Sequence, residues 1–154
     1  MTNSPEERLA AMGIVLPEPG PSMANYVPAL ISGGNLFISG QLPLGPNGME
    51  FAGKLGRDLD TASGREAARL SAVNILAQAR AALGDLSRVR QVARLVGYIN
   101  GIDSFAEPHK VLDGASDLIV DVFGEAGKHS RSVFVAANLP LNAATLVDAI
   151  ITIE

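Results

Sequence analysis

Residues 26–41 read YVPALISGGNLFISGQ, and this stretch decides how the sheet of the protein begins. Two apolar runs, Tyr26 to Ser32 and Asn35 to Ser39, flank the pair Gly33-Gly34. Two successive glycines tolerate the positive φ angles of a tight hairpin turn, so the pattern predicts a β-hairpin.

The segment before the hairpin is expected to lie outside the sheet. Ser4, Pro5 and Glu7 have the form of a helix start, with a capping hydroxyl, a proline in the first turn and a reciprocal carboxylate, and they predict a short helix from Pro5 to Met12. Residues 16–21 contain three prolines, which lack the N–H donors of a strand ladder. We therefore interpret residues 1–21 as an N-terminal helix and proline-rich linker within a single domain, residues 1–154.

Downstream of the hairpin the apolar residues follow a helical period in two segments and a strand pattern between and after them. A helical spacing of three and four predicts helices at Thr61 to Leu83, ended by Gly84, and at Lys110 to Phe123. Apolar runs predict strands at residues 89–99, 132–136 and 145–153, and a brief strand at residues 49–52. The order β-β-α-β-α-β-β predicts an α/β (α+β) fold, a mixed sheet with two helices on one face.

Composition narrows the classes of function. The chain has 154 residues, a net charge of -4 and 12 basic residues scattered among 16 acidic ones, which argues against nucleic acid as a partner. It has no cysteine, and His109 and His129 are its two histidines, so a metal site is not expected. Because no segment resembles a leader or a membrane span, no membrane association is expected and the predicted location is cytoplasmic.

Several motifs resemble the RidA/YjgF family, over residues 26–153. They are Tyr26, the segment GNLFISGQLP at residues 34–43, Gly84-Asp85-Leu86 after the long helix, Ser130-Arg131-Ser132-Val133, and Leu139-Pro140. The resemblance implies a chorismate-mutase-like fold that assembles as a homotrimer, with clefts between protomers. It also implies hydrolysis of reactive enamines and imines, such as 2-aminoacrylate, to a 2-oxo acid and ammonia without a cofactor.

The same resemblance assigns Arg131 as the anchor of a small carboxylate ligand. A planar guanidinium can hold a carboxylate through two parallel hydrogen bonds, although an ordinary surface ion pair is the alternative. Tyr26, Ser39 and Gly40 are candidates for contact with the ligand, and each could instead be an ordinary strand or turn residue. His109 stands where deaminases of the family carry an Asn, and a histidine after Pro108 is alternatively a solvent-exposed cap.

The last strand departs from the family. Leu146 stands, in an ungapped match, where deaminases carry a Glu that positions the attacking water, and a leucine cannot transfer a proton. Asp148 lies two residues later on the same strand face, so it could activate water or could pair with a cation at the trimer interface. Val133, a candidate ligand contact, replaces a Cys that is common in the family.

Three hypotheses follow. The first is a deaminase of small carboxylate-bearing imines or enamines. The second, favoured by Leu146, is a trimeric module that binds small carboxylates or partner proteins without turnover. The third is the endoribonuclease activity that the family's name carries. The acidic net charge and the small number of aromatic residues argue against this activity.

Overall fold

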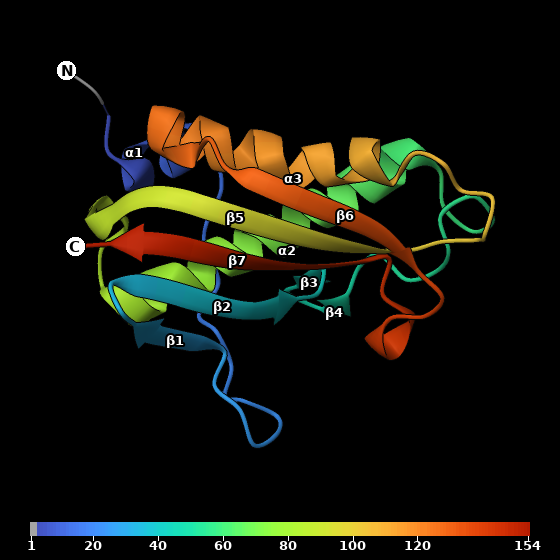
Figure 1. Cartoon of the computed structure of the whole chain (residues 1–154), viewed down its shortest axis with the longest axis horizontal. Helices are drawn as coiled ribbons and strands as arrows, with labels where there is room; N and C mark the ends of the chain where they lie inside the picture. Colours follow the sequence, from blue (N-terminus) through green and yellow to red (C-terminus); the bar gives the residue numbers. More distant parts are fainter. Residues whose placement is uncertain (1–2) are drawn as a thin grey trace.

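The computed structural model describes residues 3–154 and shows a five-stranded sheet with two long helices against it (Figure 1). The strands are β1 Ala29–Ser32, β2 Asn35–Gln41, β5 Val89–Asn100, β6 Ser130–Ala136 and β7 Thr145–Ile153, and a separate small hairpin contains β3 Leu44–Gly45 and β4 Gly48–Met49. The helices are α1 Pro5–Ala11, α2 Thr61–Leu83 and α3 Pro108–Phe123, with short 3-10 turns η1 Leu86–Arg88, η2 Gly124–Gly127 and η3 Pro140–Asn142. The strand order is β1-β2-β7-β5-β6.

The first hairpin has the predicted turn but shorter arms. Gly33 and Gly34 have φ angles of 58° and 77°, and Ser32 pairs with Asn35 across the turn. Strand β1 starts at Ala29 because Pro28 has no N–H to donate, so the predicted start at Tyr26 was wrong. Strand β2 continues to Gln41 through an irregularity in its pairing with β7.

The helices end where their capping signals indicate. Ser4 and Glu7 form the predicted capping box of α1. Helix α2 spans the predicted residues, with Asp60 as its N-cap and Gly84, at a φ of 82°, as its C-cap. Helix α3 begins two residues before the predicted start, since Pro108 occupies its first turn.

The sheet is mixed, as predicted. Strands β5 and β6 are parallel and are joined through α3, whereas the other neighbouring pairs are antiparallel. Along β7, residues from Thr145 to Ile153 alternate between buried and half-buried. One face of the sheet is therefore covered by the helices and the other is open.

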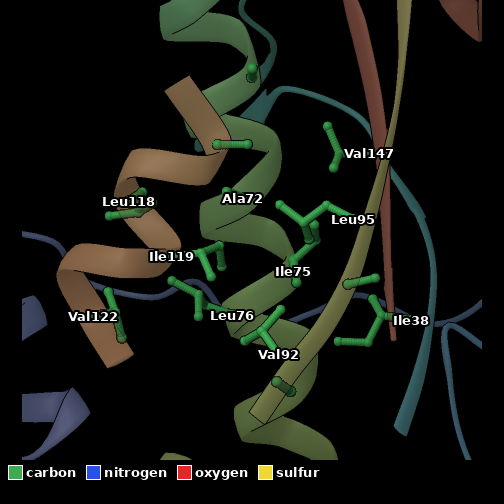
Figure 2. Packing of buried hydrophobic residues seen from close by; sticks show 14 of the residues in the cluster. Ile38, Ala72, Ile75, Leu76, Val92, Leu95, Leu118, Ile119, Val122 and Val147 are labelled. Carbon is green, nitrogen blue, oxygen red and sulfur yellow. The ribbon is translucent and has the colours of Figure 1, made fainter. Parts of the chain in front are cut away.

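Aliphatic side chains fill the space between the sheet and the helices. Figure 2 shows Ile75 and Leu76 of α2 and Ile119 of α3 beside Val92 and Leu95 of β5, and all five side chains are fully buried. Helices α2 and α3 approach closely at Gly114, where a Cβ atom would lie 2.0 Å from the carbonyl oxygen of Arg65. The fold is thus a two-layer α+β arrangement, which confirms the predicted class.

The open face of the sheet carries both apolar and charged side chains. Phe37 and Phe134 are 40% and 54% exposed on it, and Tyr98 stacks at a tilt against Phe134 with ring centroids 6.0 Å apart. Arg94 and Asp148 lie on the same face. Within residues 3–154, no helix is long and apolar enough to cross a membrane.

Candidate functional site

Arg131 is the second residue of β6, at the edge of the sheet, and its side chain turns back to α3. Its Nη1 donates to Ser116 Oγ at 3.1 Å, and its Nη2 donates to the carbonyl oxygen of His109 at 3.2 Å. Nη2 also lies 2.9 Å from Oδ1 of Asp113. The guanidinium is held in one position by three groups of α3, and the Arg131 side chain remains 28% exposed.

A histidine completes this network. His129, in the loop before β6, has Nε2 2.9 Å from Ser116 Oγ and Nδ1 2.6 Å from the carbonyl oxygen of Gly127. The Gly127 carbonyl can only accept, so Nδ1 of His129 donates to it, and in a neutral imidazole Nε2 is then the acceptor for the hydroxyl of Ser116, whose oxygen accepts from Arg131. His129 therefore orients Ser116, and Ser116 orients the Arg131 guanidinium.

Asp113 and Ser116 were missed in the sequence. A signal was available, because His109, Asp113 and Ser116 are spaced by four and three residues and so lie on one face of α3. That spacing shows a polar stripe, but it does not show which strand the stripe faces. Only the packing of α3 against β6 identifies Arg131 as its partner.

Four other predicted site residues gather on the opposite side of the protomer. Tyr26, Ser39, Gly40 and Asp148 line one shallow depression of about 630 Å³. Ser39 Oγ donates to the carbonyl oxygen of Val27 at 3.0 Å, and Tyr26 is 55% exposed beside it. The hairpin and β7 thus bring together residues separated by more than 100 positions in the chain.

Leu146 covers the backbone of Gly40 beside this depression. A Cβ atom on Gly40 would lie 2.4 Å from Leu146 Cδ2, so a larger residue than glycine would not fit there without movement. Position 146 therefore supplies an apolar contact to Gly40 and no acid–base group.

Asp148 is the acid of β7, and partial burial raises the pKa of its carboxyl above the ordinary value, while the charge of Arg94 acts in the opposite direction. Arg94 lies on the neighbouring strand β5 and donates from Nη2 to Ser132 Oγ at 2.6 Å. Asp148 thus has a raised pKa and a cation near it on the same sheet face.

The group around Arg131 and the group around Asp148 cannot meet within one protomer. Asp148 pairs with Val96, and Val96 pairs with Ser132, so these three residues share a sheet face. Arg131 is adjacent to Ser132 and therefore points to the opposite face. Strands β2 and β6 are also three steps apart in the sheet, which corresponds to about 14 Å.

Two predicted contacts have other surroundings in the protomer. Val133 packs against the hydrophobic core, and the His109 side chain is exposed at the start of α3 while its carbonyl binds Arg131. A further cavity of about 360 Å³, between the proline-rich linker and α2, is lined by none of the predicted site residues. Among residues 3–154, no three His, Cys, Asp or Glu side chains come together in a way that could hold a metal ion.

Comparisons with known proteins agree with this architecture. Residues 6–153 match the family described as "YjgF/chorismate mutase-like, putative endoribonuclease". Protein TCP17 of Trypanosoma cruzi is 43% identical over 147 residues, which are 95% of this chain and 92% of TCP17. The crystal structure of Atu1372 from Agrobacterium tumefaciens, a protein of unknown function, is 48% identical and superposes with a TM-score of 0.92 over 97% of this chain and 92% of that one.

A protein from Shewanella oneidensis MR-1, whose description also carries the endoribonuclease name, is 42% identical with a TM-score of 0.95 over 98% of this chain and 100% of that one. Both the sequence match and the shared two-layer architecture extend over almost the whole chain. The chain therefore belongs to the YjgF/chorismate mutase-like family.

Proposed function

We propose that the protein is a homotrimer that hydrolyses small reactive 2-imino acids and their enamine tautomers in clefts between protomers. One observation supports the proposal most directly: Arg131 lies on one side of the sheet, and Tyr26, Ser39, Gly40 and Asp148 gather on the other. Half-site one contains Arg131 and half-site two contains Tyr26, Ser39, Gly40 and Asp148. Two neighbouring protomers can join these halves, whereas one protomer cannot.

In such a cleft, Arg131 holds the carboxylate of the imine next to the electrophilic C=N carbon. Water adds to that carbon, and the resulting carbinolamine expels ammonia to leave a 2-oxo acid. The reaction consumes one water and involves no net oxidation, so acid–base groups suffice for it.

Asp148 is the residue we assign to water activation. A carboxyl with a raised pKa is a better proton acceptor at neutral pH than an ordinary aspartate. Leu146 packs against Gly40 and forms an apolar wall on one side of half-site two. Ser39 and Tyr26 offer hydroxyl groups at its rim.

The proposal is tested by mixing two inactive variants. Arg131→Ala and Asp148→Asn should each lose release of 2-oxobutanoate and ammonia from freshly generated 2-iminobutanoate. If the two variants are unfolded together in equal amounts and refolded as mixed trimers, about one quarter of the clefts should combine an intact half from each variant. Recovery of about a quarter of the wild-type activity is expected, and no recovery would contradict a shared cleft.

A binding module without turnover is the second candidate, because Leu146 occupies the position of the usual catalytic Glu. It predicts a trimer that binds 2-oxobutanoate through Arg131 while imine hydrolysis stays at the rate of the protein-free control. Sedimentation of the wild-type protein measures the trimer directly. RNA binding that persists at physiological salt would instead support the endoribonuclease name.

A further inference from the structure

We infer that Asp113 is an internal carboxylate that competes with the ligand for Arg131 and thereby sets how weakly the site holds small carboxylates. The inference rests on the proposed role of Arg131 as the anchor. It concerns a residue of α3 that lies outside the motifs by which the chain resembles its family.

Asp113 contacts the Arg131 nitrogen that a carboxylate ligand also needs. A guanidinium has two edges that can hold a carboxylate through paired donors, Nε with Nη2 and Nη1 with Nη2, because Cδ fills the third edge. Nη2 belongs to both, and it is the atom that lies 2.9 Å from Asp113 Oδ1. Nη2 has one hydrogen on each edge, and its two acceptors are Asp113 Oδ1 and the carbonyl oxygen of His109, so a ligand gripped by two bonds must share or displace one of these contacts, of which Asp113 is the charged one.

Asp113 is not needed to hold Arg131 in place. Ser116 Oγ accepts from Nη1 and the carbonyl oxygen of His109 accepts from Nη2, so two hydrogen bonds remain when the Asp113 charge is removed. An asparagine at this position also keeps the shape and one oxygen. Arg131 should thus stay in place in the Asp113→Asn variant.

The negative charge of Asp113 also repels a carboxylate ligand bound to Arg131. A carboxylate bound to Arg131 would lie roughly 6 Å from the Asp113 charge, and the Asp113 side chain is 38% exposed. This repulsion weakens binding by about 3-fold if the screening is that of bulk water, and by about 100-fold if it is that of a protein surface. We expect about 10-fold for this half-exposed pair.

Asp117 supplies a matched control. It lies one helical turn after Asp113, and its Oδ2 is 3.2 Å from Arg65 Nη2. Arg65 Nη1 is also 3.7 Å from Asp113 Oδ2, so both acids interact with the same arginine. Asp113→Asn and Asp117→Asn therefore change the net charge equally, and each removes an ion pair of Arg65. Only Asp113→Asn also removes the negative charge that contacts Arg131.

Calorimetric titration of the assembled protein with 2-oxobutanoate tests the inference. Asp113→Asn should tighten binding by about 10-fold, Asp117→Asn should change it by less than about 2-fold, and the difference should shrink as salt is added. Binding of the uncharged 2-oxobutanamide should be the same in the Asp113→Asn variant and the wild type.

Weaker binding in Asp113→Asn, an equal gain in Asp117→Asn, or no binding in any variant would overturn the inference. Its failure is distinct from failure of the proposed hydrolysis. A wild type that does not hydrolyse imines, but whose Asp113→Asn variant binds 2-oxobutanoate more tightly, would refute the enzyme and support the competing carboxylate.

Discussion

Replacing Arg131 by alanine should remove ligand binding and leave the fold intact. The substitution deletes hydrogen bonds to Ser116 and to the His109 carbonyl, together with the ion pair to Asp113. Each hydrogen bond contributes about 0.5–1.5 kcal/mol and a partly exposed ion pair about 0–1 kcal/mol, so the free energy of unfolding should fall by about 1–4 kcal/mol. A domain of this size is typically stable by about 5–15 kcal/mol and should still fold.

The loss of affinity should be much larger than the loss of stability. Two charge-assisted bonds to a carboxylate are worth about 1.5–3 kcal/mol each, which corresponds to at least a 100-fold weaker binding of 2-oxobutanoate. Urea unfolding followed by circular dichroism measures the first quantity and calorimetry the second.

Arg90→Ala is the control for this experiment. Arg90 is a strand arginine whose Nε lies 3.9 Å from Glu154 Oε1, and its side chain is 65% exposed. It should change neither binding nor stability by a measurable amount. If Arg131→Ala instead lowers the stability by more than about 4 kcal/mol, or binds 2-oxobutanoate within 3-fold of the wild type, Arg131 is a structural residue and the reasoning fails.

Gly114→Ala should destabilise the protein by at least about 3 kcal/mol in urea unfolding, because the new methyl group meets the backbone oxygen of Arg65; a loss under 1 kcal/mol would mean that the helices separate easily. Asn100→Ala should cost about 2–4 kcal/mol in the same assay, since the buried amide donates to Asn142 Oδ1 and to the Gly53 carbonyl; a neutral result would show that water replaces it. The raised pKa of Asp148 means that the folded protein takes up this proton at a higher pH than the unfolded chain, so the residue's contribution to stability falls as the pH rises above about 4. The Asp148→Asn variant should therefore have a higher melting temperature than the wild type at pH 7, and the two melting temperatures should converge below about pH 4. A difference in melting temperature that does not depend on pH would show that it does not come from the raised pKa of Asp148.

Secondary structure was predictable wherever a local rule acts. The capping box at Ser4, the hairpin turn at Gly33-Gly34 and the C-cap at Gly84 each depend on residues close together in the chain. Strand boundaries were less accurate. The sequence did not indicate how far β2 would continue past Ser39, because pairing with β7 determines it.

Part of the candidate site could also be predicted from the sequence, and part could not. Arg131, Ser39 and Asp148 could be selected from the sequence, since their chemistry and their motifs are visible in it. The separation of these residues into two groups could not be predicted from the sequence, because the face on which a strand residue lies depends on register and pairing with neighbouring strands. The network around Arg131 was not predictable from the sequence either. It is formed by Asp113, Ser116 and His129, whose side chains come together with Arg131 only when α3 packs against β6.

The amino-acid sequence by itself determined most of the helices and strands and the mixed two-layer class, because hydrophobic period, caps and turn residues act over a few positions. The tertiary structure alone decided that Arg131 meets Asp113 and that Asp148 lies on the other side of the sheet. These are contacts between segments distant in the chain, and they are fixed by the packing of one helix and the pairing of five strands rather than by any local preference.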